Sequence, residues 1–109
     1  MLHIDFITVS KVSSMKSVKI SGKSTKHKVF MYTLSTCAWC KMAKSYFCER
    51  NIESEYVDVD RCSPQEYELV RQDITSKGGT MSFPTIIIDD KILITGFHKD
   101  RIEEVLELR

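Results

Sequence analysis

The sequence predicts one domain of the α/β class. The chain has 109 residues, which suits a single modest core, and 42% of them are apolar against 28% charged. Short β-prone runs alternate with helical patterns along residues 29–109. The expected order of elements is β-α-β-α-β-β-α, without an internal repeat or a low-complexity tract.

The first half of this domain contains two predicted strands and one helix. Residues 29–33 are β-branched, aromatic or otherwise β-prone, which predicts a buried strand. Ser35 and Thr36 carry helix-capping side chains, so a helix is expected from about Ala38 to Arg50. Apolar and polar residues alternate along residues 55–60, which predicts the second strand.

The second half opens with a helix whose start is well marked. Ser63-Pro64-Gln65-Glu66 is a capping box with proline at the first helical position. This helix should end at Gly78-Gly79, because glycine adopts the left-handed conformation at least cost. Residues 85–88 and 92–95 flank a short polar turn and predict a hairpin. The last helix is indicated by apolar residues at helical spacing, namely Ile102, Val105 and Leu106.

Residues 1–28 form a basic extension ahead of this domain. They hold six lysines against one aspartate, a net charge of +5, whereas residues 29–109 have a net charge of −4. Brief alternation at residues 2–6 and 18–20 predicts two weak strands, arranged as a hairpin with its turn near Lys11–Ser14. Two interpretations stay open: the lysines steer an acidic partner, or they only solubilise an added edge strand or a frayed end.

Composition and charge exclude several classes of function. Apolar runs such as Ile86–Ile88 are far too short to span a membrane, and no stretch has the layout of a secretory signal. The net charge of +1 provides no general field that would attract nucleic acid. We therefore expect a cytoplasmic protein with neither a membrane nor a nucleic-acid partner.

Cys37-Ala38-Trp39-Cys40 is the motif that carries chemistry. Its first cysteine falls where a strand ends and a helix begins, so unpaired backbone N–H groups and the helix dipole favour a thiolate there. Such a position lowers the pKa of a cysteine by one to several units from about 8.5. Cys40, one helical turn further on, is placed to resolve a mixed disulfide on Cys37. Lys41 and Lys44 follow in the first turns and add positive potential.

Other interpretations of the cysteines compete with this one. A structural zinc site needs two further ligands at suitable spacing, and Cys48 and Cys62 do not provide a second such pair. A chance pair is the third interpretation, and the strand–helix junction weighs against it. We expect Cys48 to pack among apolar residues, since free cysteine behaves as a small buried residue. Cys62 is expected to lie in a loop without a functional role.

Several segments together resemble the glutaredoxin family of thioredoxin-like proteins. Pro84 lies 44 residues beyond Cys40 and is followed at once by the predicted hairpin. The resemblance covers about residues 29–108 and implies a thioredoxin-like fold, with a four-stranded mixed sheet and about three helices. From its own alternation, the basic extension of residues 1–28 is expected to add one or more strands. The segments that carry the resemblance are Val29–Leu34, Cys37–Cys40, Glu55–Asp60, Phe83-Pro84-Thr85 and Thr95-Gly96-Phe97.

The resemblance also implies a substrate-binding surface around Cys37. Residue statistics alone favour a trans Pro84, whereas the family has a cis-proline beside the nucleophilic sulfur. The backbone of Phe83, after Ser82 in the same loop, would then pair with a bound substrate like a strand. Gly96 would let the chain approach the ligand, and Phe97 is either a ligand contact or a core residue. Trp39 is either an exposed contact for the partner or packed against its helix.

Departures from the family pattern bear on the electron donor. Ser35 and Thr36 stand where glutathione-using members usually carry a lysine, and Ser82-Phe83 replaces their threonine-valine. His98-Lys99 stands where those members often have an acidic pair, and Asp100 is the acid that remains nearby. The chain is therefore closer to redoxins that a protein reductase reduces, some of which supply electrons to ribonucleotide reductase, and glutathione stays the alternative.

The predicted function is thiol–disulfide exchange on protein disulfides, with Cys37 attacking and Cys40 resolving. No bound cofactor is required, because the electrons travel on sulfur. Ala38 replaces a proline that disfavours cluster bridging in the family, so an iron–sulfur-cluster or metal-holding module that uses Cys37 is the alternative function.

Overall fold

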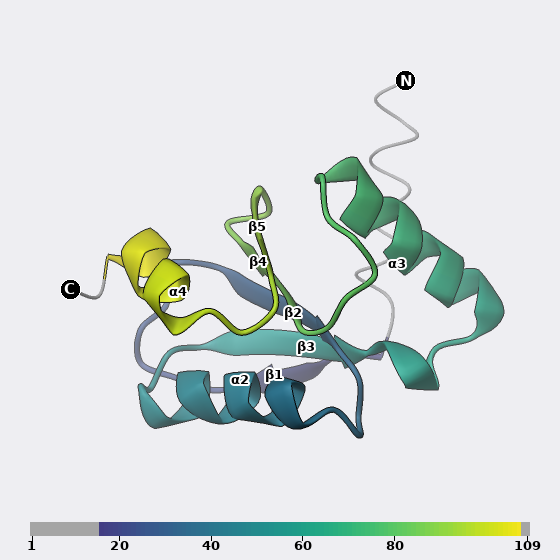
Figure 1. Cartoon of the computed structure of the whole chain (residues 1–109). Helices are drawn as coiled ribbons and strands as arrows, with labels where there is room; N and C mark the ends of the chain where they lie inside the picture. The colour runs from purple at the N-terminus through teal and green to yellow at the C-terminus, as the bar shows by residue number, and fades with distance from the viewer. Residues whose placement is uncertain (1–15, 108–109) are drawn as a thin grey trace.

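The computed structural model describes residues 16–107, which form one five-stranded mixed sheet covered by helices on both faces (Figure 1). The strand order is β1-β3-β2-β4-β5. β2 and β3 are parallel, and the other neighbouring pairs are antiparallel. The strands are β1 (Val18–Ile20), β2 (Val29–Thr33), β3 (Ser54–Asp58), β4 (Thr85–Ile88) and β5 (Ile92–Thr95), and the helices are α2 (Ala38–Glu49), α3 (Pro64–Ser76) and α4 (Lys99–Leu106).

Four of the five strands are those expected for residues 29–109, in the expected order. The fifth, β1, pairs antiparallel with β3 at the sheet edge, so the basic extension does add a strand. The other strand of the expected hairpin and its turn near Lys11–Ser14 lie outside the described residues. The division into an extension and a domain beginning at residue 29 stays a prediction.

The two faces of the sheet carry separate hydrophobic cores because side chains alternate along each strand. Met31 and Ile86 point to the face covered by α2 and α4, where they meet Phe47 of α2. Their neighbours Tyr32 and Ile87 point to the face covered by α3. All five side chains are 0–3% exposed. Helices thus pack against both faces of the sheet.

Helix α3 begins and ends as its sequence predicts. The Ser63 hydroxyl accepts a hydrogen bond from the N–H of Glu66 at 3.2 Å, and the Glu66 carboxylate accepts one from the N–H of Ser63 at 2.8 Å. Gly78, with φ +84°, follows the helix in the left-handed conformation. The preceding strand is shorter than expected: β3 ends at Asp58, and residues 59–61 form a 3₁₀ turn whose buried Val59 packs on the α3 side.

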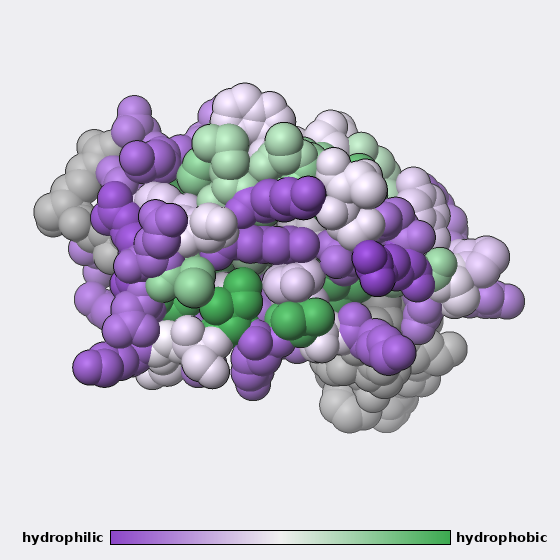
Figure 2. Space-filling view, turned by 90° about the horizontal axis from the view of Figure 1, so that it is seen from below, coloured by the Kyte–Doolittle hydropathy of each residue, from purple (hydrophilic) through white to green (hydrophobic). Residues whose placement is uncertain are grey.

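The chain shows no helix among residues 16–107 that is long and apolar enough to span a membrane. Figure 2 views the molecule from below, the side of Figure 1 on which α2 lies, and shows patches of apolar surface between long hydrophilic side chains.

Candidate active site

Cys37 is the N-cap residue of α2, at the point where the chain leaves β2. Its backbone is extended, and its Sγ accepts a hydrogen bond from the N–H of Cys40 at 3.3 Å. The expectation that Ser35 and Thr36 cap this helix is therefore wrong. The N–H and hydroxyl of Ser35 donate instead to Asp60, at 2.9 and 2.5 Å. The cysteine sulfur itself occupies the position where a helix start favours negative charge.

The surroundings of Cys37 favour its thiolate. Partial burial raises the pKa of this thiol, since it disfavours the charged form. Hydrogen bonds from the Cys40 side chain and from the N–H groups of Cys40 and Trp39 act in the opposite direction. The positive charge of Lys44 adds to them, and the net effect holds the pKa of Cys37 below its ordinary value. Lowered pKa is the property a nucleophilic cysteine needs.

Cys40 has the opposite environment, one turn further into α2. It is fully buried, and its Sγ accepts a hydrogen bond from the N–H of Leu34 at 3.4 Å. Burial raises the pKa of Cys40, and the hydrogen bond and charge of Cys37 raise it further. The two thiols, both free in this structure, thus differ in acid strength, with the more acidic one nearer the surface.

A half-buried ion pair joins α2 to β3, and the charge of its lysine acts on both sulfurs. Lys44 Nζ is 3.1 Å from Asp58 Oδ1 and 3.8 Å from the ring centroid of Tyr56, with 17% of the Lys44 and Asp58 side chains exposed. Thr33 Oγ1 donates to the same Asp58 oxygen at 2.6 Å. Lys44 is among the residues predicted from the sequence, whereas Asp58 is not. No local pattern marks Asp58, because the strand predicted over residues 55–60 places it inside the strand; in the structure it is the partner of Thr33, where the parallel strands β2 and β3 end together.

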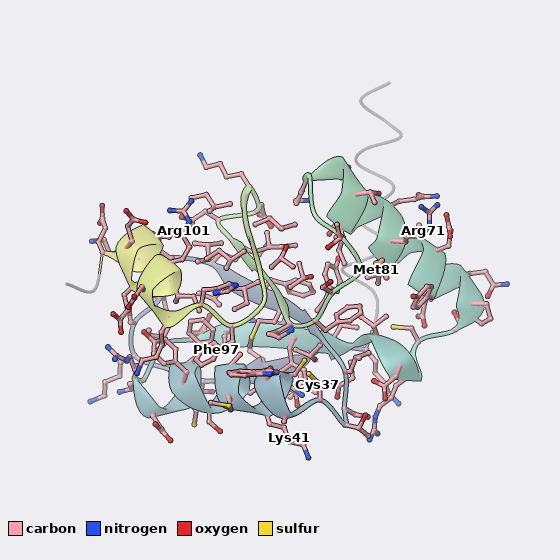
Figure 3. The ribbon with its side chains drawn as sticks, viewed as in Figure 1. Cys37, Lys41, Arg71, Met81, Phe97 and Arg101 are labelled. Atoms are coloured by element: carbon pink, nitrogen blue, oxygen red, sulfur yellow. The ribbon has the colours of Figure 1, made fainter. Side chains whose placement is uncertain are left out.

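The loop before β4 runs directly beside Cys37. The Phe83–Pro84 bond is cis, as the resemblance implies, and the carbonyl oxygen of Phe83 lies 4.0 Å from Cys37 Sγ. Gly96 has φ +87°, and its N–H donates to the Pro84 carbonyl at 2.7 Å, which holds the two turns together. Ser82 is exposed in the same loop. Figure 3 shows Cys37 at the start of α2, close to where this loop crosses it.

The two aromatic residues predicted as contacts for a partner or ligand, Trp39 and Phe97, differ in their exposure. Trp39 is 58% exposed, so it does not pack into the protein. Phe97 is half-buried, and its ring meets the Tyr46 ring edge-to-face at 5.6 Å between centroids. In Figure 3, Phe97 lies between α2 and α4, and Lys41 projects outward from α2. Phe97 therefore packs against the core, as one of its two interpretations predicts, while Trp39 exposes apolar surface to solvent.

The remaining cysteines lie apart from the pair. Cys48 is exposed, so the expectation that it packs in the core is wrong. The buried residues of α2 include Cys40, Ala43 and Phe47, and eight residues at 100° each turn Cys48 about 80° away from Cys40. Cys62 is half-buried beside the α3 core, where burial raises its pKa. No group of three or more metal-binding side chains within residues 16–107 is arranged to hold an ion.

Fold and site together define a thioredoxin-like redox protein with a close pair of cysteines. The family model for glutaredoxin matches residues 29–93. A glutaredoxin of Methanosarcina mazei is 37% identical, with a TM-score of 0.75 over 84% of this chain and 88% of the other. The methanoredoxin of Methanosarcina acetivorans is 34% identical, with a TM-score of 0.74 over 84% of this chain and 95% of the other.

Curated relatives point to the same family. A glutaredoxin-like protein of a Clostridium pasteurianum rubredoxin operon is 32% identical over 71% of this chain and 95% of its own length. Glutaredoxin 1 of Rickettsia conorii is 32% identical over 63% of this chain and 65% of its own length. The chain belongs to the glutaredoxin family.

Proposed function

We propose that this protein is a thiol–disulfide oxidoreductase that reduces protein disulfides. The single observation that carries the proposal is the asymmetry of the cysteine pair. Cys37, half-exposed at a helix start, has a lowered pKa, while Cys40, buried one turn inside, has a raised pKa. A thiolate at the surface and a protected thiol behind it are what attack and resolution require.

The reaction proceeds in two balanced exchanges. The Cys37 thiolate attacks one sulfur of the substrate disulfide, a Cys37–substrate disulfide forms, and the other substrate sulfur leaves as a thiolate that takes up a proton. Cys40 then loses its proton and attacks Cys37 Sγ, which releases the second substrate thiol. The pair ends as a Cys37–Cys40 disulfide, and its two electrons are on the substrate thiols, which have taken up one proton from Cys40 and one from solvent.

Substrate binding is assigned to the surface around Cys37. The carbonyl of Phe83 lies 4.0 Å from the Cys37 sulfur, which supports pairing of its backbone with an extended substrate segment. Exposed Trp39 supplies apolar contact area. The other proposed contacts are Ser82, Pro84, Gly96 and Phe97.

The oxidised pair must be reduced again by two electrons, and we propose a protein disulfide reductase as the donor rather than glutathione. Ser35, at a position where glutathione-using members usually carry lysine, is held by Asp60. His98 and Lys99 supply no carboxylate for the amino group of glutathione, so that Asp100 alone stands where those members have an acidic pair. Reduction of the oxidised protein by glutathione is to be compared with reduction by thioredoxin reductase and related flavin or iron–sulfur reductases. Faster reduction by glutathione would overturn this assignment.

Cysteine variants test the proposed chemistry. Cys37→Ser should abolish reduction of a disulfide protein such as insulin, whereas Cys48→Ser, a matched control outside the pair, should retain it. Cys40→Ser should accumulate a substrate adduct on Cys37 that mass spectrometry detects and a reducing agent removes. Full activity of the Cys37→Ser variant would contradict the proposal.

The alternative function, a cluster or metal held by Cys37, predicts a different observation. Protein purified without oxygen would then show visible absorption bands and stoichiometric iron. If the protein shows neither the bands nor the iron and reduces disulfides, the result supports the oxidoreductase function over the cluster-holding one.

A further inference from the structure

An open surface hollow of about 370 Å³ lies between α2 and the start of α4. Its apolar lining comes from Met42, Tyr46 and Phe97. Met42 is 49% exposed and follows the exposed Trp39 by three residues, so the two side chains lie on the same face of α2. Apolar surface thus continues from Trp39, within the cysteine motif, to Met42 in the lining of the hollow.

Charged side chains border the hollow in a definite order along α2. Lys41, four residues after Cys37, is about 6 Å further along the helix axis, and Glu49 is about 18 Å along it. Lys99, at the first position of α4, adds a second positive charge to the lining. Within residues 16–107 no carboxylate forms an ion pair with either lysine. The hollow therefore offers unpaired positive charge near the reactive sulfur and negative charge at its far end.

An extended polypeptide fits this arrangement better than a small molecule does. The hollow is open, so it contacts an occupant on one side only, whereas small-molecule sites enclose most of their ligand. At about 3.3 Å per residue, the 18 Å from Cys37 to Glu49 corresponds to about five or six extended residues. Met42 suits varied apolar partners because its side chain is flexible and polarizable.

Resting on the proposed function, we propose that this hollow binds the segment that follows the reactive cysteine of the partner protein. The segment carries acidic residues two to three positions after that cysteine, where they meet Lys41 and Lys99. An apolar side chain comes next and covers Met42, and a basic residue five to six positions after the cysteine meets Glu49. The hollow thereby selects partner segments in which the acidic residues come before the basic residue.

Two synthetic peptides of identical composition test this proposal. Each begins with a cysteine in a mixed disulfide with thionitrobenzoate, whose release gives a yellow colour. One peptide continues with a serine, two glutamates, a leucine and a lysine, so that its acidic residues lie two and three positions after the cysteine and its lysine lies five positions after it. In the other peptide the lysine follows the serine, and the two glutamates come last. Reduced protein should attack the acid-first peptide about fivefold faster, and salt should narrow this difference.

Charge reversal at the hollow should remove that preference. The Lys41→Glu/Lys99→Glu variant is expected to react with both peptides at equal rates or to favour the lysine-first peptide. The matched control, Lys19→Glu/Lys91→Glu, has the same net charge, but its exposed lysines lie on β1 and in the β4–β5 turn. It should keep the preference of the unmodified protein.

The outcomes separate this proposal from the proposed function. If the unmodified protein attacks both peptides at equal rates, or if the control variant also loses the preference, docking in the hollow is refuted while disulfide exchange stands. If it attacks neither peptide nor hydroxyethyl disulfide, the oxidoreductase function itself fails.

Discussion

Replacing Lys44 by methionine should raise the pKa of Cys37. Lys44 is the one side-chain cation among the causes that lower this pKa, although Lys41 is three residues nearer to Cys37 in the sequence. Only 17% of the Lys44 side chain is exposed, and Asp58 and Tyr56 hold its ammonium group in place. Methionine keeps the length of the apolar stem and removes the charge.

The magnitude follows from the geometry of α2. Lys44 is seven residues after Cys37, a rise of about 10 Å, and helical side chains lean toward the N-terminus. At about 10 Å and an effective dielectric constant of about 20 to 40, one charge contributes about 0.8–1.7 kcal/mol, or about 0.6–1.2 pKa units. Asp58 offsets part of this charge. We therefore expect the Lys44→Met change to raise the pKa of Cys37 by about half a unit to one unit.

The assay measures the thiolate of Cys37 as a function of pH. Ultraviolet thiolate absorbance and the rate of reaction with iodoacetamide are followed in a background that carries Cys48→Ser and Cys62→Ser. The Lys44→Met/Asp58→Asn variant controls for the unpaired carboxylate that the single change leaves half-buried. Lys41→Met removes a charge from an exposed position on the same helix and should leave the pKa of Cys37 nearly unchanged.

Two results would refute this reasoning. An unchanged pKa in the Lys44→Met variant would mean that the half-buried ammonium does not act on the sulfur. An equal rise in the Lys41→Met variant would mean that general surface charge, rather than the Lys44–Asp58 pair, sets the acidity of Cys37.

Three further predictions concern stability and accessibility. Phe47→Ala should lower the free energy of unfolding by about 3–5 kcal/mol in urea titration, because Phe47 is 0% exposed. Tyr67→Ala, at a site that is 43% exposed, should lower it by about 0.5 kcal/mol or less. Equal losses in the two variants would contradict the assigned core. Ser63→Ala removes one bond of the α3 capping box and should cost about 1 kcal/mol in the same titration, with an unchanged unfolding midpoint as the contrary result. Exposed Cys48 should be alkylated faster than half-buried Cys62, as peptide mass mapping will show, and the reverse order would be inconsistent with the structure.

Local sequence patterns predict most of the fold because the residues that determine each element are neighbours in the chain. The capping box of Ser63 and the left-handed Gly78 lie within or beside the helix that they delimit. The two apolar runs of residues 85–88 and 92–95, with a short polar turn between them, are enough to predict the hairpin of β4 and β5. The same reasoning places Cys37 at the junction of a strand and a helix.

The errors concern contacts between residues far apart in the sequence. Ser35 has the right side chain for a helix cap, but its hydroxyl is taken by Asp60, 25 residues away. The Lys44–Asp58 pair joins residues 14 apart, on a helix and a neighbouring strand. Helix periodicity leaves Cys48 near the edge of the buried stripe, and only the packed structure shows that it is exposed. Tertiary partners, which no local pattern contains, decide all three cases.

The same helix turn that gives the two thiols different acidities also orders the proposed reaction in time. While Cys37 is a thiolate, its charge and its hydrogen bond with Cys40 raise the pKa of Cys40 and keep that thiol protonated. Once Cys37 has formed a mixed disulfide, its negative charge is gone, and both of these contributions disappear. The pKa of Cys40 then falls at the stage when it must attack, while Lys44 continues to favour the thiolate. The first exchange therefore prepares the second, because it removes two contributions that raise the pKa of the attacking thiol.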